Sequence, residues 1–262
     1  MKIKFCSLYS GSSGNCQYIK SENATVIVDA GLSAKKIQQG IINIGEDPKK
    51  IDAIFITHEH IDHIQGAGIM SRRLDIPIYA NERTWEAMGT CIGNIKQHNI
   101  KILENTVAIG DLLVKPFDIS HDAAHPVGYN IFYKNKKISL VTDTGCANET
   151  ITKSIMNSDL LLIESNHDED MVLIGPYPWS LKRRVLSEFG HMSNDAAGNL
   201  IKSIVKKGTE IVLLGHLSRE NNFPELAYKT VESILTENSI EVNPGVCLSL
   251  TYSDKSSNVY EI

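Results

Sequence analysis

Short apolar runs separated by turn-forming residues dominate the first part of the chain. β-Branched and aromatic residues fill the runs while Gly, Ser and Asn lie between them, which predicts a series of short strands. The predicted strands are Lys2–Leu8, Cys16–Lys20, Thr25–Asp29 and Ile51–Thr57. A helix is expected to begin near Ser33, whose hydroxyl can cap it, because Ile37 and Ile41 follow at helical spacing. A second helix is predicted after His63.

The middle of the chain continues as strands joined by tight turns. Apolar runs predict strands at Ile76–Tyr79, Ile100–Leu103, Leu112–Phe117, Gly128–Tyr133 and Ile138–Thr142. The pairs Gly110-Asp111 and Lys134-Asn135 are typical of hairpin turns. This stretch therefore predicts a β meander.

After Asp143 the pattern changes to alternating helix and strand. The expected helices are Glu149–Met156, Leu181–Phe189, Ser193–Lys207 and Pro224–Glu237, and the expected strands are Leu160–Glu164 and Glu210–Leu214. A closing hairpin is predicted from Ile240–Asn243 and Val246–Tyr252. Two sheets that carry helices on their outer faces accommodate this order as a layered sandwich.

Composition narrows the class of protein. With 262 residues, 42% hydrophobic and 22% charged, the chain is an ordinary globular sequence, and one domain spanning residues 1–262 is predicted. A formal charge of −5 argues against wholesale wrapping of nucleic acid, although a local basic groove would not show in the sum. Five scattered cysteines without a C-x-x-C pair argue against a disulfide framework. The absence of a signal-like or membrane-length apolar run predicts a cytoplasmic protein without a membrane partner.

Nine histidines are an unusual number, and their spacing is informative. The predicted strand Ile51–Thr57 runs directly into an H-x-H-x-D-H cluster formed by His58, His60, Asp62 and His63. Alternate residues of an extended chain face the same way, so the first two histidines can bind one ion while Asp62 and His63 turn toward a second. Imidazole and carboxylate ligands suit zinc, manganese or iron, and catalytic zinc sites keep one position open for water.

A site for two metals needs further ligands. His121, Asp143 and His216 each follow an apolar run that predicts a strand, where loops collect side chains above a rigid sheet. Any one of them alone would more often be a surface or turn residue. Their common position together with the histidine cluster makes them candidate metal ligands.

These motifs resemble the metallo-β-lactamase fold superfamily, whose pattern runs in order through nearly the whole chain. The resemblance implies an α+β protein, a four-layer αββα sandwich of two mixed β-sheets flanked by helices, with two metal ions between the sheets. It implies the following roles: His58, His60 and His121 hold the first ion, Asp62, His63 and His216 hold the second, Asp143 bridges both, and Asp29 orients a ligand histidine. A carboxylate rather than a cysteine at the bridging position is similar to the hydrolase and nuclease branches.

Smaller motifs narrow the resemblance. They are Ser10-Gly11-Ser12-Ser13-Gly14-Asn15, His121-Asp122-Ala123, Pro126-Val127-Gly128-Tyr129, Glu164-Ser165-Asn166-His167-Asp168, Gly190-His191-Met192-Ser193-Asn194 and His216-Leu217-Ser218-Arg219-Glu220-Asn221-Asn222. This set is similar to the YycJ/WalJ-type bacterial metallohydrolases, which are regarded as metal-dependent DNA exonucleases. His125 departs from the pattern, because an acidic residue is expected before Pro126.

The predicted chemistry is hydrolysis of a phosphodiester. Two ions roughly 3.5–4 Å apart would activate a bridging water and clamp the oxygens of an in-line displacement, with Asp62 and Asp143 as catalytic carboxylates. The leaving sugar oxygen needs a proton, and His191 and His167 are the candidate general acids. Each of these histidines could equally serve a structural role, as a helix cap or a partner of backbone carbonyls.

Several polar residues are candidate substrate contacts. Ser12, Ser13, Gly14 and Asn15 form either a phosphate-binding nest of backbone N–H groups or a tight turn. The late motifs supply the remaining predicted contacts: Asn166, Ser218, Arg219 and Asn221. Tyr177 and Trp179 could stack on a terminal base, but core packing or a rigid loop is the favoured interpretation.

The leading hypothesis is a phosphodiesterase with two divalent metal ions that acts on nucleic acid, with DNA favoured. It would be a 5′-to-3′ exonuclease whose nucleophile is a metal-bridging hydroxide, with Zn²⁺ as the expected ion and Mn²⁺ as the alternative. One alternative is a ribonuclease of the tRNA-processing type or a hydrolase of a β-lactam, thioester or lactone. Another is a catalytically idle metal-binding regulator, against which the carboxylates Asp62 and Asp143 argue.

Overall fold

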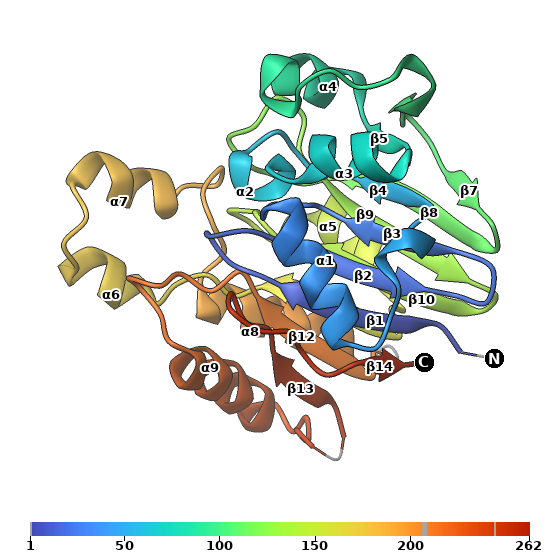
Figure 1. Ribbon diagram of the computed structural model, residues 1–262. Helices are drawn as coiled ribbons and strands as arrows, with labels where there is room; N and C mark the ends of the chain where they lie inside the picture. Colours follow the sequence, from blue (N-terminus) through green and yellow to red (C-terminus); the bar gives the residue numbers. More distant parts are fainter. Residues whose placement is uncertain (1, 206–208, 244) are drawn as a thin grey trace.

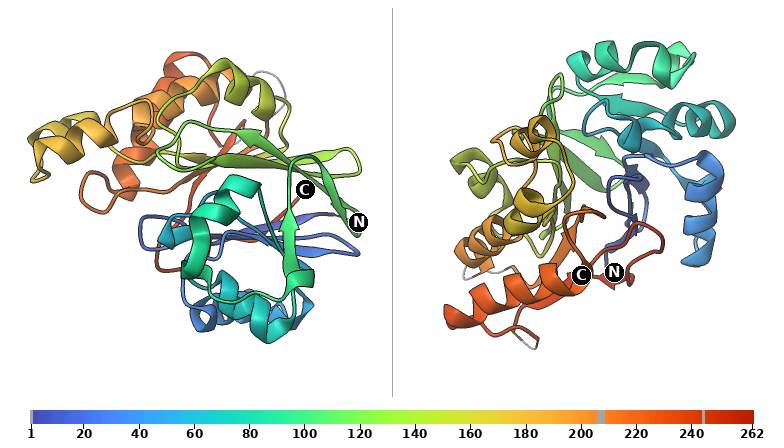
Figure 2. Two further views of the ribbon diagram at one scale, coloured as in Figure 1. Left: turned by 90° about the horizontal axis from the view of Figure 1, so that it is seen from above. Right: turned by 90° about the vertical axis from the view of Figure 1, so that its left-hand side faces the viewer.

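A computed structural model describes residues 2–205, 209–243 and 245–262. Two β-sheets face each other and helices cover their outer faces, as the two views in Figure 2 show. The predicted αββα arrangement of two mixed sheets is therefore confirmed.

The first sheet orders its strands β14-β1-β2-β3-β4-β5-β6 within the described residues. The strands are β1 (Lys4–Tyr9), β2 (Cys16–Lys20), β3 (Thr25–Val28), β4 (Ala53–Phe55), β5 (Ile78–Ala80), β6 (Ile100–Ile102) and β14 (Tyr260–Glu261). The β1, β2 and β14 pairings are antiparallel, and from β3 to β6 the neighbours are parallel. Parallel strands bring their carboxyl ends to one edge, and that edge carries the histidine cluster after β4.

The second sheet has the order β13-β12-β11-β10-β9-β8-β7 in the same described part. Its strands are β7 (Val107–Ile109), β8 (Leu112–Asp118), β9 (Val127–Tyr133), β10 (Lys136–Val141), β11 (Leu160–Glu164), β12 (Ile211–Gly215) and β13 (Cys247–Leu250). An antiparallel meander from β7 to β10 continues into parallel pairs from β10 to β13. This half also presents the carboxyl ends of several strands at one edge.

Helices complete the outer layers (Figure 1). Those of the first half are α1 (Ala34–Asn43), α2 (Ile61–Ile64), α3 (Ala67–Leu74) and α4 (Glu82–Met88), with 3₁₀ turns at Pro48–Lys50, Gly89–Ile92 and Gln97–Asn99. Those of the second half are α5 (Glu149–Ile155), α8 (Asn194–Val205) and α9 (Pro224–Glu237). Two further helices, α6 (Glu169–Ile174) and α7 (Trp179–Val185), project away from the sheets. None of the described helices is long and apolar enough to cross a membrane.

Side-chain alternation explains the layers. In β11, Leu160 and Leu162 pack between the sheets, whereas Leu161 and Ile163 pack in the separate cluster under the second set of helices. A strand covered on both faces reads as a continuous apolar run, which is why the sequence signal at β11 is strong. The same division separates Val26 and Val28 of β3, which pack between the sheets, from Ile27, which packs in the outer cluster of the first half.

Some predictions of local structure are wrong. The closing hairpin does not form: Ile240–Asn243 contains only an isolated bridge between Val242 and Val246, and β13 pairs in parallel with β12. The free edge of β12 offers a longer run of backbone partners than a short hairpin would. The predicted meander is also too long at its start, because β5 and β6 belong to the first sheet.

The helix predictions need smaller corrections. The predicted helix Leu181–Phe189 starts and ends earlier, as α7, because Gly190 and the residues before it turn back toward the sheet. Trp179 is 67% exposed, so the predicted core packing of this residue is wrong. The predicted helix Ser193–Lys207 is confirmed as far as Val205, and Lys206 and Lys207 lie outside the described residues.

Candidate metal centre

The predicted ligands gather where strands of both sheets end. The histidine cluster follows β4, Asp143 follows β10, and His216 comes directly after β12. Asp29 (φ 61°), Asp143 (φ 58°) and His216 (φ 54°) all adopt the left-handed backbone conformation, which is uncommon outside glycine. Strained backbone of this kind concentrates at functional sites, where the surrounding packing holds it in place.

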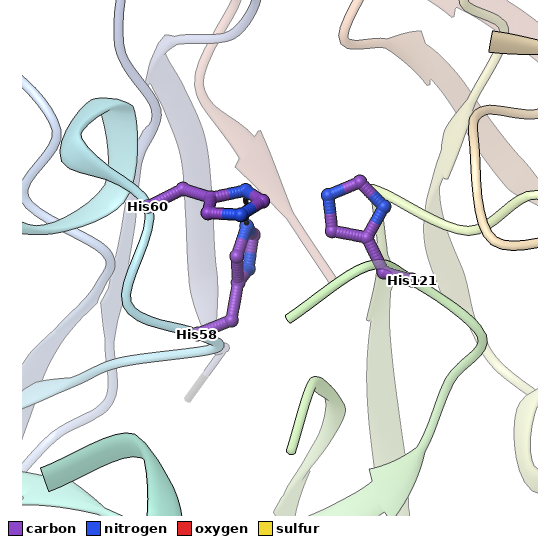
Figure 3. A group of neighbouring side chains, drawn as sticks. All are labelled: His58, His60 and His121. Carbon is purple, nitrogen blue, oxygen red and sulfur yellow. Dashed lines mark hydrogen bonds between the residues drawn. The ribbon is translucent and has the colours of Figure 1, made fainter. Parts of the chain in front are cut away.

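The first group of candidate ligands consists of His58, His60 and His121. Figure 3 shows the rings of His58 and His60 on one side and His121 on the other. One nitrogen from each ring lies within 4.8 Å of the others. Nδ1 of His121 donates a hydrogen bond to the carbonyl oxygen of Gly190 at 3.1 Å, which leaves its Nε2 available as a ligand atom.

The second group consists of Asp62, His63 and His216, whose donor atoms meet within the same 4.8 Å limit. Oδ2 of Asp62 is 3.5 Å from Nε2 of His63 and 3.8 Å from Nε2 of His216. Asp143 lies between the two groups, because it forms a further such cluster with His58 and His63. The structure therefore brings together all seven residues predicted to be metal ligands.

Buried carboxylates hold the ligand rings from behind. Asp29 accepts a hydrogen bond from Nδ1 of His63 at 2.8 Å and another from the backbone N–H of Thr57 at 2.9 Å. Burial alone would lower the pKa of His63, but Asp29, Asp143 and Asp62 raise it well above its ordinary value. The arrangement thus concentrates negative charge that favours a cation.

The residues present fit divalent metal ions. Oδ2 of Asp143 and Nε2 of His216 are buried and have no hydrogen-bond partner in the described part of the chain. Leaving buried polar atoms unpaired is costly, and coordination to a cation would remove that cost. Imidazole and carboxylate donors are the set that zinc, manganese and iron prefer. Two ions are accommodated when the first and second groups each hold one and Asp143 is shared.

The N-terminal loop connects the two ligand segments. Ser10 Oγ accepts a hydrogen bond from the backbone N–H of His216 at 2.9 Å, and the Asn15 backbone N–H donates to the Asp62 carbonyl at 2.8 Å. Nδ2 of Asn15 is also 3.1 Å from Nε2 of His63. Gly31 allows this approach, because a Cβ there would meet the Asp62 carbonyl oxygen at 1.5 Å.

A cavity of about 240 Å³ opens beside the ligands. Four of the predicted substrate contacts line it: Ser12, Asn166, Ser218 and Asn221. The other four, Ser13, Gly14, Asn15 and Arg219, lie next to it rather than in its wall. Nη2 of Arg219 donates to the hydroxyls of Ser13 at 3.1 Å and Ser253 at 3.3 Å. A larger cavity of about 410 Å³ beside α4 contains none of the predicted ligands.

The two candidate general acids have different surroundings. His191 lines the cavity, and its Nδ1 donates to Oε1 of Glu164 at 2.8 Å. Burial lowers the pKa of His191, but Glu164 more than compensates and raises it above its ordinary value. His167 is 1% exposed and does not line the cavity, and burial lowers its pKa. Geometry therefore favours His191.

Glu164 is the site residue to which the sequence assigns no role. Its Oε1 accepts hydrogen bonds from Nδ1 of both His191 and His216 at 2.8 Å, and its Oε2 accepts from the backbone of Thr144 and Met192. Burial opposes ionisation, but the two histidines hold the pKa of this carboxyl well below its usual range. Like the candidate ligands, Glu164 lies at the end of an apolar strand. This position is the feature of the sequence that could have identified it as a site residue.

Two mixed sheets flanked by helices, with a cavity of histidines and carboxylates at the strand ends, define the class of metal-dependent αββα hydrolases. The chain belongs to the metallo-beta-lactamase superfamily, whose family model matches residues 9–216.

Individual relatives extend the likeness over almost the whole chain. Exodeoxyribonuclease YycJ of Bacillus anthracis is 40% identical over 248 residues, which cover 92% of each chain. Exodeoxyribonuclease WalJ of Streptococcus pneumoniae is 39% identical over 265 residues and covers 99% of this chain and 98% of its own. The crystal structure of the metallo-beta-lactamase fold protein YhfI from Bacillus subtilis covers both chains fully, with a TM-score of 0.76 and 18% identity. The narrower resemblance predicted from the motifs is confirmed.

Proposed function

We propose that the protein is a metal-dependent phosphodiesterase that removes nucleotides from DNA, as a 5′-to-3′ exonuclease. The observation that carries the proposal is the cavity lined by residues of both metal-ligand groups and by His191, whose Nδ1 donates to the buried Glu164. Likeness over almost the full length to two proteins named exodeoxyribonucleases supports DNA as the substrate. Zn²⁺ is the ion that we assign to the centre, with Mn²⁺ as the alternative.

Different residues of the site serve different steps of the hydrolysis. Divalent ions held by the two ligand groups would activate water and neutralise charge on the phosphate. The Ser12 and Ser218 hydroxyls and the Asn166 amide line the same space and can donate hydrogen bonds to phosphate oxygens. These contacts orient the scissile bond.

His191 donates the proton to the leaving sugar oxygen. The raised pKa favours the protonated ring, and the bond from Nδ1 to Glu164 directs Nε2 away from the carboxylate. Nε2 can then give its proton to the sugar oxygen as the phosphorus–oxygen bond breaks. Glu164 stays ionised and stabilises the ring before it releases the proton.

The test is a nuclease assay with defined ends. Purified protein loaded with zinc or manganese is incubated with 5′-phosphorylated DNA that carries a label at either end, and products are followed over time. Stepwise release of 5′ mononucleotides that stops in EDTA and is absent in His121→Ala is expected. RNA, a chromogenic β-lactam and a thioester are assayed in parallel. Faster turnover of any of these than of DNA, or no turnover of DNA by wild-type protein with two bound metals, would overturn the proposal.

A further inference from the structure

Part of the cavity wall beside the metal ligands carries large apolar side-chain surfaces. It comes from the segment Asp168–Gly190, called here the arm, which includes α6 and α7 and extends away from both sheets (Figure 1). Tyr177, Leu181 and Val185 of the arm line the cavity that also contains the candidate ligands, and Arg184 beside them, which pairs with Asp122, lines it as well. A phosphate group makes no favourable contact with such a surface, whereas the flat apolar face of a nucleobase can stack on it.

The arm is held in place by polar contacts at both of its helices. Nζ of Lys182 donates to the carbonyl oxygen of Leu173 at 2.6 Å, which ties α7 to α6. Arg184 forms a two-bond pair with Asp122, in the loop that carries His121. The apolar wall is therefore already in position next to the metal centre before a substrate enters.

Tyr177 itself has restricted freedom. Pro176 and Pro178 flank it, and each proline ring fixes its own backbone and restricts the residue before it. The Tyr177 side chain is half-buried and contributes to the cavity lining. Because the backbone that carries the ring is already restricted, stacking of a base costs less entropy there than on a flexible loop.

Asn221 adds a polar group to the same part of the cavity. It lines the cavity and is 1% exposed, and its Oδ1 has no hydrogen-bond partner among the described residues. An ionised phosphodiester offers no hydrogen-bond donor, so it cannot satisfy this oxygen. Sugar hydroxyls and exocyclic amino groups of bases can.

We propose that Tyr177, Leu181, Val185 and Asn221 form a nucleoside subsite, in which the Tyr177 ring stacks on the base of the terminal nucleotide. The inference rests on the proposed function and names what the enzyme recognises beyond the phosphate. The cavity of about 240 Å³ is smaller than the roughly 300–1,000 Å³ of pockets for drug-sized ligands, a size that favours one nucleotide over a base pair. Trp179 does not line the cavity and lies outside the subsite.

The experiment compares two DNA ends on the metal-loaded protein. A single-stranded, 5′-phosphorylated oligonucleotide is used with either a normal first nucleotide or an abasic tetrahydrofuran residue in its place. Wild-type protein is expected to show about a tenfold lower KM for the normal end. Tyr177→Ala should lose this preference, because its KM for the normal end should rise toward its KM for the abasic end, and Tyr177→Phe should keep it. Trp179→Ala, two residues away in the same arm, is the matched control and should behave as wild type.

A binding measurement on wild-type protein keeps the test independent of catalysis and of any variant. Deoxyadenosine 5′-monophosphate is expected to bind about tenfold more tightly than deoxyribose 5-phosphate. Equal binding of the two, or equal loss of activity of Tyr177→Ala on normal and abasic ends, overturns the subsite. Failure of wild-type protein to cleave any DNA overturns the proposed function instead, while the binding comparison still decides the subsite.

Discussion

Oε1 of Glu164 lies 2.8 Å from Nδ1 of His191, and the carboxylate is completely buried. The same oxygen accepts a hydrogen bond from the candidate metal ligand His216. One carboxylate thus orients a ring that faces the substrate cavity and a ring that belongs to the metal centre. A substitution of either histidine should therefore alter the orientation of the other ring through Glu164.

Replacing His191 tests its assignment as the proton donor. His191→Gln should lower kcat on DNA by a factor of about 10² to 10⁴, because the leaving oxygen loses its acid. Metal content should stay at the wild-type value, since His191 belongs to neither of the two assigned ligand groups, and a loss of metal would place His191 with Asp143, Glu164 and His216 as a ligand. His167→Gln is the comparison, and its kcat should remain within a few-fold of wild type. The reverse order of effects would assign the acid to His167.

The pH profile should depend on Glu164. In the proposed mechanism activity requires protonated His191, so kcat is expected to fall as pH rises through the pKa of that ring. Glu164 raises this pKa, and Glu164→Gln removes the stabilising charge, so the alkaline limb should move to lower pH. Steady-state rates across the pH range measure the shift. Metal content is determined for each sample, and an unmoved limb in a fully loaded variant contradicts the assigned role.

Asp29 should matter for metal affinity, although it is not a ligand in the assignment. Asp29→Asn weakens the hydrogen bond that orients His63, and losses of this kind typically cost about 10- to 100-fold in metal affinity. Competition with a chromophoric chelator measures the change. Asp118→Asn is the matched control. Oδ1 of Asp118 lies 3.0 Å from Nε2 of the exposed His125, and neither residue belongs to the assigned ligands. A wild-type affinity for Asp29→Asn would show that the orientation of His63 has another source.

The ligand candidates could be predicted because each carries its own local signal. The cluster around His58 is dense in sequence, and Asp143 and His216 stand just beyond apolar runs. Glu164 stands in the same kind of position, yet its partners are 27 and 52 residues away along the chain. Only the three-dimensional fold shows that its carboxylate meets two histidines.

The fold, too, could be predicted from the sequence only in part. Alternation and length predict that a strand exists at Val246–Tyr252, and β13 lies there. Which strand it pairs with depends on the free edge of β12, which no local pattern encodes. The sequence raises Tyr177 as a stacking residue but does not favour that role, because Tyr177 belongs to a proline-rich segment with no periodicity.

Gly31→Ala should disrupt the centre without touching a ligand side chain. A Cβ at Gly31 would lie 1.5 Å from the carbonyl oxygen of Asp62, so the chain carrying Asp62 and His63 must move. We expect a loss of about 3 kcal/mol or more in the free energy of unfolding, together with reduced metal content. Gly45→Ala is the control, because Gly45 has φ +79° and open space around it, and backbone strain alone should cost about 1 kcal/mol. Denaturant unfolding and metal analysis of both variants measure the difference. Equal destabilisation of the two, with full metal content in Gly31→Ala, would mean that this close backbone approach does not position the ligands.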